Sequence, residues 1–312
     1  MLFSGHFKTF KGEKAMGERV GIVGIGLMGS ALSANLMQAG FEVQGYDVDG
    51  KRVDEFADRG GIPVESAAAA AKGARWIVTS LPTSDIVREA VFGEGGILEG
   101  AEEGLLLADS TTSRPEDSER LGAELAERGI RFLDAAVSGT STMAWKKDLI
   151  IIAGGAKEDF DACRPYFEGM ARAAYHMGPV GSGAVSKLII NLVLAGNRLA
   201  LAEGLILGTK AGMEMNNLLA VLQDGACSSK TMIDKGPKMI NADYSPEGLV
   251  RIALKDSRLM LEQGQRFGSP MLLTNVWSQV AQAAYQAGLA EKDSVAFYEV
   301  LRGMAGLEQR TG

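Results

Sequence analysis

The chain has 312 residues, a formal net charge of −7 at pH 7 and a hydrophobic content of 46%, which is typical of a soluble globular protein with room for two domains. Its acidic balance and its lack of a Lys/Arg cluster disfavour nucleic acid as a partner. Two distant cysteines, Cys163 and Cys227, form neither a zinc-type pair nor a disulfide framework, so we expect a cytoplasmic protein.

Residues 1–17 lack periodicity and the long apolar core of a signal peptide, and we interpret them as a loose N-terminal extension. From residue 18 to 179, short apolar runs alternate with helical patterns, as in βα units on a parallel sheet. We therefore expect a Rossmann-type, doubly wound parallel sheet that binds ligands at the carboxyl ends of its strands. The expected strands lie in the runs RVGIVGI, FEVQGYD, RWIVTSL, GLLLADS, RFLDAAV, LIIIAGG and AAYHMG.

A glycine motif follows the first expected strand. Gly24, Gly26 and Gly29 form G-x-G-x-x-G directly after RVGIV and directly before the helical pattern SALSANLMQAG. In this context the glycines permit a tight turn, the approach of a pyrophosphate and close packing of helix on strand. The N–H groups at the start of the helix, near Leu27 and Met28, would bind the phosphates. The motif therefore predicts a dinucleotide site; a glycine turn without a ligand is the alternative.

The second expected strand ends at Asp47, 23 positions after Gly24, where a carboxylate accepts hydrogen bonds from the ribose hydroxyls of an adenosine. A carboxylate there also repels a 2′-phosphate. We therefore predict NAD as the cofactor, with NADP as the alternative because Lys51 and Arg52 lie close in the sequence.

Two later strand ends complete the predicted ligand edge. Leu81 and Pro82 follow the run RWIVTS and are expected to flank the cofactor. Ser138, Gly139 and Thr140 follow the run RFLDAAV, and their backbone N–H groups and hydroxyls can receive a substrate carboxylate. A plain surface turn is the alternative for these three residues.

After residues 178–184 (GPVGSGA), long helical patterns replace the β-branched runs, so we expect an all-α domain over residues 180–312 that begins with a long interdomain helix. This helix is apolar, but polar residues such as Asn197, Arg198 and Glu203 interrupt it, which favours a buried helix over a membrane span. No metal site is expected, because His6 and His176 are far apart and have no neighbouring ligand cluster.

Lys187 and Asn191 stand four residues apart in the long helix and therefore project from one face. Such a pair can contact one small ligand, since an ammonium donates a proton and an amide orients an oxygen. The alternative is a lysine that extends from an apolar helix into water, with an asparagine that caps a local group.

Two segments, DAAVSGT (134–140) and GPVGSGAVSKLIINL (178–192), resemble the β-hydroxyacid dehydrogenase family, whose members carry D-A-P-V-S-G-G and G-x-x-G-x-G-x-x-x-K-x-x-N-N. The resemblance begins near Arg19 and includes SLPTS (80–84), DSTTSRP (109–115) and LKDSRLMLE (254–262), in the family's order. It implies an NAD(P)-dependent interconversion of a small 3-hydroxy acid and its semialdehyde. Lys187 would be the general acid and base, and Asn191 would hold the reacting oxygen or the lysine in line.

The resemblance implies further roles. Thr112 matches a position near the nicotinamide ribose, and Lys255 matches a second lysine, from a helical domain that closes over cofactor and substrate. The alternative for Lys255 is a solvated Lys-Asp pair on a helix. A homodimer or homotetramer through the helical domains is also implied. Ala136, Thr140 and Ile190 depart from the family pattern, which leaves open the choice of substrate, such as 3-hydroxyisobutyrate or tartronate semialdehyde.

Two other functions remain alternatives. Imine reductases share this architecture but generally lack the lysine, so Lys187 argues against that reaction. A non-catalytic dinucleotide-binding scaffold or sensor usually loses its acid/base residue, whereas this chain has Lys187, Asn191 and Lys255. These residues favour an enzyme.

Overall fold

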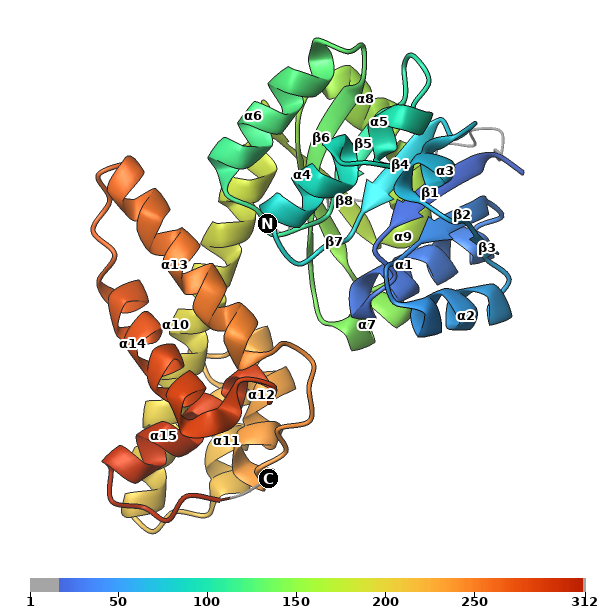
Figure 1. The fold of residues 1–312 in the computed structure, drawn as a ribbon. Helices are drawn as coiled ribbons and strands as arrows, with labels where there is room; N and C mark the ends of the chain where they lie inside the picture. Colours follow the sequence, from blue (N-terminus) through green and yellow to red (C-terminus); the bar gives the residue numbers. More distant parts are fainter. Residues whose placement is uncertain (1–16, 311–312) are drawn as a thin grey trace. The chain divides into compact units, whose positions relative to one another are not determined.

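The structure of the chain, a computed structural model, describes residues 17–310. The predicted extension of residues 1–17 therefore lies, except for Gly17, outside the described part. The chain divides into two compact units, Met1–Lys187 and Leu188–Gly312. The labels in Figure 1 place every strand in the first unit, and the second unit is drawn as helices.

The first unit is built on an eight-stranded sheet with the order β3-β2-β1-β4-β5-β6-β7-β8. Seven strands coincide with the predicted runs, and the two-residue β3 was not predicted. The strands are β1 (Arg19–Val23), β2 (Glu42–Tyr46), β3 (Ile62–Pro63), β4 (Trp76–Thr79), β5 (Leu106–Asp109), β6 (Arg131–Ser138), β7 (Ile150–Gly154) and β8 (Ala173–Gly178).

The strand directions confirm the predicted parallel sheet for β1 to β6 and correct it at the far edge. Neighbouring strands are parallel except for β6 and β7, which pair antiparallel. The connection over residues 139–149 contains only the five-residue helix α7 (Ser141–Trp145). This connection is too short to cross over with a helix packed on the sheet, so the chain returns in the opposite direction.

Helices cover both faces of this sheet, which confirms the doubly wound fold. One face buries apolar side chains of α1, α2, α8 and α9, and the other buries side chains of α3, α4, α5 and α6. The helices are α1 (Leu27–Gln38), α2 (Gly50–Asp58), α3 (Ala67–Ala71), α4 (Ser84–Phe92), α5 (Ile97–Gly100), α6 (Pro115–Ala126), α8 (Lys157–Ala162) and α9 (Arg164–Met170).

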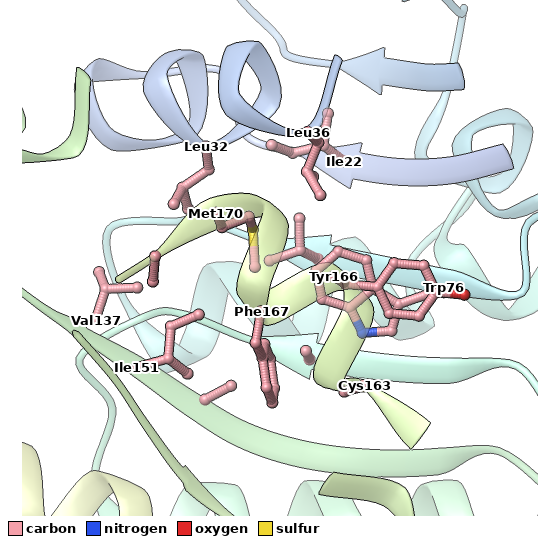
Figure 2. Close-up of a cluster of buried hydrophobic side chains, with 14 of the residues drawn as sticks. Ile22, Leu32, Leu36, Trp76, Val137, Ile151, Cys163, Tyr166, Phe167 and Met170 are labelled. Carbon is pink, nitrogen blue, oxygen red and sulfur yellow. The ribbon is translucent and has the colours of Figure 1, made fainter. Parts of the chain in front are cut away.

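The core on the α1 side contains a group of packed aromatic rings among aliphatic side chains (Figure 2). Trp76 of β4 stacks on Tyr166 of α9 with 4.6 Å between ring centroids, and Phe167 meets Trp76 edge-on at 6.4 Å. Leu32 and Leu36 of α1 pack on the same cluster. Burying these side chains contributes about 1.5–3 kcal/mol each, and it holds α1 against the sheet.

The second unit continues from α10 as a helical bundle. Its core includes Trp277 and Phe297, whose rings meet edge-on at 5.0 Å. The predicted all-α domain is confirmed in the described residues. The helices are α10 (Ser182–Lys210), α11 (Met215–Asp224), α12 (Lys230–Asn241), α13 (Val250–Arg266), α14 (Leu272–Ala284) and α15 (Phe297–Met304), with short turns at Tyr285–Leu289 and Ser294–Ala296.

Helix α10 is the long helix predicted between the domains, and it runs across the division between the two units. Among the described helices it is the one that is long and apolar enough to cross a membrane by length and composition. Core helices of soluble proteins pass the same criteria. Its polar residues are used within the second unit, because Asn191 donates to Asp256 (2.9 Å) and Arg198 donates to Ser294 (3.2 Å).

Candidate active site

The turn between β1 and α1 requires glycine at two of its three motif positions. Gly24 has φ +93°, and a Cβ there would lie 2.4 Å from the backbone oxygen of Ser80. A Cβ on Gly29 would lie 2.0 Å from the backbone oxygen of Gly24, so the start of α1 packs directly on the turn. At Gly26 a Cβ would meet only the Arg52 guanidinium, at 3.5 Å. The backbone at Gly26 is therefore open to an approaching ligand.

The N-terminus of α1 is suited to an anion. Gly26 is the N-cap and supplies no side chain to the first N–H groups, and the first turn contains no acidic residue. Leu27 is exposed and Met28 is half-buried. Because the first N–H groups of a helix have no acceptor within the helix, this turn can receive the pyrophosphate of NAD(P). The residues present fit the predicted cofactor.

Asp47, just after β2, is bound to the glycine turn. Its Oδ2 accepts a hydrogen bond from the Ile25 N–H at 2.6 Å, and its Oδ1 accepts one from the Asp49 N–H at 2.9 Å. The Arg52 Nη1 lies 3.6 Å from Asp47 Oδ2. A carboxylate and a guanidinium therefore stand together at the position predicted for the adenosine ribose, so the local charge suits a ribose hydroxyl and a 2′-phosphate alike.

The residues after β4 lie beside this turn. A Cβ on Gly24 would come within 2.8 Å of Leu81 Cδ2, so the Leu81 side chain flanks the glycine turn. The Leu81 N–H donates to Thr111 Oγ1 at 3.2 Å, which joins the loop after β4 to the loop after β5. Pro82 follows and is exposed. The structure thus brings Leu81 to the predicted cofactor edge.

Asp109 ends β5 as a buried carboxylate to which sequence reasoning gave no role. It accepts hydrogen bonds from the Thr79 hydroxyl (2.8 Å), the Thr111 N–H (3.0 Å) and the Ser113 hydroxyl (3.3 Å). Burial raises the pKa of Asp109, while the bonds from Thr111, Thr79 and Ser113 lower it. These bonds hold the loop that carries Thr112. The sequence did contain a signal for this network, because an acid at the end of the strand is followed by several hydroxyl residues (DSTTS, residues 109–113).

The predicted substrate residues stand at the end of β6, the next strand of the sheet. Ser138 is the last residue of β6, and Gly139 has φ +142° with Leu149 packed where a side chain would be. The Thr140 Oγ1 accepts a hydrogen bond from the Met143 N–H at 3.2 Å and so caps α7. This cap explains why a threonine suits a position where the family pattern has glycine, because threonine is a preferred N-cap residue.

Lys187 and Asn191 both lie on α10, one helical turn apart, and both are half-buried. The Asn191 amide donates to Asp256 Oδ2 at 2.9 Å. The Lys255 Nζ lies 3.4 Å from Asp256 Oδ1, so Asp256 of α13 joins two of the predicted site residues. The sequence offered Asp256 only as the partner of Lys255 in a solvated pair, and the bond between Asp256 and Asn191 was not predicted.

Within the first unit, the structure gathers the predicted residues on one edge of the sheet, at the carboxyl ends of adjacent strands. The glycine turn follows β1, Asp47 follows β2, Leu81 follows β4 and Thr112 follows β5, while Ser138 ends β6. Asn191 and Lys255 belong to the second unit.

Within residues 17–310, no group of three or more His, Cys, Asp or Glu side chains is arranged to bind a metal ion. His176 Nε2 lies 2.8 Å from the backbone oxygen of Gly155. His6 lies outside the described residues.

Two family models match the chain. Residues 19–178 match the NAD-binding domain of 6-phosphogluconate dehydrogenase. Residues 181–301 match a domain described as the NAD-binding domain of NADP-dependent 3-hydroxyisobutyrate dehydrogenase. The two matches together span most of the described residues.

Characterised relatives are similar over most of their length. Glyoxylate/succinic semialdehyde reductase 1 of Arabidopsis thaliana is 31% identical over 80% of this chain and 87% of its own. The 3-sulfolactaldehyde reductase of Escherichia coli is 30% identical over 82% and 86%. A solved structure of 3-hydroxyisobutyrate dehydrogenase from Mycobacterium tuberculosis with L-serine has a TM-score of 0.83 and 28% identity, and the match covers 92% of this chain and 100% of that one.

Proposed function

Since this chain belongs to the β-hydroxyacid dehydrogenase family, we propose that Lys187 is the general acid and base of its NAD(P)-dependent reaction. The reaction interconverts a small hydroxy acid and its semialdehyde. The bound nicotinamide accepts or supplies the hydride. The observation that carries the proposal is the placement of Lys187 and Asn191 one turn apart on α10.

Lys187 handles the proton that must accompany the hydride. In the oxidative direction it accepts the proton of the substrate hydroxyl, and in the reductive direction its ammonium donates a proton to the carbonyl oxygen. The positive charge also stabilises the alkoxide that develops at that oxygen. Asn191, held by Asp256 at 2.9 Å, orients the same oxygen or the lysine.

Ser138, Gly139 and Thr140 anchor the substrate carboxylate. The Ser138 and Thr140 hydroxyls and the backbone N–H groups after β6 are donors of the kind that hold a carboxylate. Thr140 adds bulk beside this position, so the residue bears on which head group is accepted. The substrate class we propose is a small acid with its hydroxyl on the third carbon.

Gly24, Gly26, Leu27, Met28 and Gly29 bind the pyrophosphate in this proposal. The other cofactor contacts are assigned to Asp47, Leu81, Pro82, Thr112 and Lys255. We propose NAD as the main cofactor because Asp47 is fixed at the turn by the Ile25 N–H. Arg52, 3.6 Å from Asp47, allows NADP as well, since a guanidinium neutralises a 2′-phosphate.

We further propose a cytoplasmic homodimer or homotetramer that associates through the second unit. Exposed apolar side chains are concentrated in that unit, and a second copy would remove them from water. They are Ile189, Val193, Leu207, Met213, Val221, Ile233, Phe267, Leu272, Leu273, Val276, Tyr285 and Met304.

The direct test replaces Lys187 with alanine and measures turnover and NAD binding separately. The Lys187→Ala variant should lose about 10²- to 10⁴-fold in kcat, the range for a general acid or base, while its Kd for NAD stays near that of the wild type. Lys157→Ala removes an exposed lysine of α8 and is the matched control. A kcat of Lys187→Ala equal to that of the wild type would exclude this role for Lys187.

A substrate panel separates the competing functions. Purified enzyme is assayed with a series of semialdehydes and with cyclic imines, each with NADH and NADPH. Reduction of semialdehydes is the expected result. Reduction of imines alone would assign imine reductase chemistry, and cofactor binding without turnover of either class would assign a scaffold or sensor.

A further inference from the structure

Asp134 connects the central sheet to the helix that carries Lys187. It lies on β6 with only 3% of its surface exposed. Its Oδ1 accepts a hydrogen bond from the Gly181 N–H at 3.0 Å, and its Oδ2 accepts one from the Ala184 N–H at 2.7 Å. Both carboxylate oxygens are therefore used by the start of α10, and Ala184 precedes Lys187 by three residues.

The start of α10 packs on β6 and β7 without intervening side chains. A Cβ on Gly183 would lie 2.2 Å from the backbone oxygen of Asp134 and 2.7 Å from that of Ile152. A Cβ on Gly154 of β7 would lie 2.4 Å from Asp134 Oδ1. Glycine at these two positions lets the helix approach closely enough for the carboxylate to reach its N–H groups. The position of the first turn is thus set by backbone contacts and by one side chain.

Keeping Asp134 charged in this buried position costs free energy, because the carboxylate loses its contact with water. Burial raises the pKa of Asp134 to about 6, the bonds from Ala184 and Gly181 lower it, and the charge of Asp109 adds to the rise. Asp109 stands opposite Asp134 in the pairing of β5 with β6. A neutral side chain would avoid this desolvation, but an amide offers one oxygen where the helix presents two N–H donors. What the carboxylate adds is two acceptors at once.

We propose that Asp134 is a positioning residue for the reaction, which fixes the first turn of α10 and thereby places the Lys187 amine relative to the sheet edge. The inference rests on the proposed role of Lys187. Unlike the residues assigned to the cofactor, Asp134 acts through the helix alone. It should therefore govern the chemical step and leave cofactor affinity unaltered.

The test is Asp134→Asn, which keeps the side-chain shape and removes one acceptor. We expect kcat to fall by about 10- to 100-fold, the scale of a misplacement near 1 Å, with the Kd for NAD unchanged. Hydrogen exchange over residues 181–187 should become faster in the variant. Glu214→Gln is the matched control, since Glu214 also accepts two backbone N–H groups at a helix start, that of α11, and it should leave kcat unaltered.

The results separate this inference from the proposed function. If Lys187→Ala is inactive and Asp134→Asn keeps wild-type kcat, the positioning role is wrong and the proposed function stands. If Lys187→Ala keeps its turnover, both assignments are wrong. A kcat loss in Asp134→Asn with an equal loss in NAD affinity would indicate general damage to the first unit and would overturn the positioning role.

The wild-type enzyme supplies a second measurement that does not depend on folding of a variant. Below about pH 6, Asp134 becomes neutral and accepts less well, so kcat in the reductive direction should fall on the acid side. Asp109 on β5 acts on the Asp134 charge, Glu119 of α6 lies near Gly181, and His176 of β8 bonds the backbone oxygen of Gly155, next to Gly154. Asp109→Asn removes a charge that raises the pKa of Asp134, so the acid limb should persist but move to lower pH. A flat wild-type kcat from pH 5 to 7 would contradict the inference.

Discussion

In the proposed cofactor site, Arg52 and Asp47 together would set how the ribose position discriminates between NAD and NADP. The Arg52 side chain spans both neighbouring acids, with Nη1 at 3.6 Å from Asp47 Oδ2 and Nε at 3.3 Å from Asp49 Oδ2. Its charge therefore offsets the repulsion that a lone Asp47 would exert on a 2′-phosphate. The preference for NAD over NADP would then depend on both Asp47 and Arg52. The glycine motif alone does not determine this preference.

Replacing Arg52 with alanine should affect one cofactor selectively. A hydrogen bond to a charged group contributes about 1.5–3 kcal/mol, so kcat/KM with NADP should fall by about 10- to 100-fold, whereas kcat/KM with NAD should change little. Steady-state kinetics with both cofactors measures the ratio. Arg59→Ala, at the end of the same helix α2, is the control. Equal losses with both cofactors would assign Arg52 a structural role.

Thr140 can be tested as a selectivity residue because its structural contribution is small. Its hydroxyl caps α7, and replacing a threonine N-cap with glycine costs only a few tenths of a kcal/mol. Thr140→Gly should therefore fold normally and shift preference toward acids with larger head groups, by about tenfold or more for one methylene-sized group. Relative kcat/KM over semialdehydes of increasing length measures the shift. Thr142→Gly, on the exposed side of α7, should leave the ranking unaltered.

Among the helices and strands, those that could be predicted are the ones whose own sequence pattern matches their place in the fold. Periodicity predicts β1, its glycine turn and α1, because one short segment contains the apolar run of the strand, the turn residues and the helical pattern. The two-residue β3 contains Pro63 and has no periodicity to detect. The antiparallel direction of β7 depends on the path of the short connection that contains α7. The pattern of apolar residues does not indicate that path.

Burial of Asp134 between β6 and the start of α10 should make stability depend on pH. Because the pKa of Asp134 is about 6 in the folded chain and 3.8 is its usual value, the folded state binds more protons between these values. Proton binding by Asp134 therefore adds to the free energy of unfolding. This contribution, on the order of 3 kcal/mol, is complete below about pH 3.8 and is lost as pH rises through 6.

The Asp134→Asn variant isolates this effect. Urea unfolding curves of wild type and variant at pH 4.5 and pH 7 should show the wild type losing stability with rising pH relative to the variant. Asp109, whose pKa burial also raises, contributes a background of the same sign in both proteins. Parallel pH profiles for the two proteins would mean that Asp134 does not titrate in this range.

At the scale of the whole molecule, the site was predictable where one segment carries a complete signal. The glycine turn, Asp47 and the spacing of Lys187 and Asn191 can all be identified in the printed sequence. Asp134 and Asp256 were not assigned roles, since their partners lie far away in the chain: Asp134 binds Gly181 and Ala184, and Asp256 binds Asn191. Such contacts exist only once the fold brings distant segments together.

The oligomeric state is the remaining property that the second unit should determine. Leu272 and Val276 of α14 are 81% and 52% exposed. A Cβ on Gly196 of α10 would lie 3.6 Å from Leu273 Cδ1 of α14, so the two helices are neighbours at this point. A second copy that covers this surface would gain about 25 cal/mol for each Å² of apolar surface removed from water.

Placing charges on that surface should therefore dissociate the oligomer. If the wild type forms the proposed dimer or tetramer, the double variant Leu272→Glu, Val276→Lys is expected to elute as a monomer at the same concentration in size-exclusion chromatography with light scattering, because charged groups resist burial at an interface. Ile86→Glu changes an exposed apolar residue of α4 in the first unit and should leave the wild-type mass unaltered. A wild-type chain that is itself monomeric at micromolar concentration would overturn the proposed dimer or tetramer.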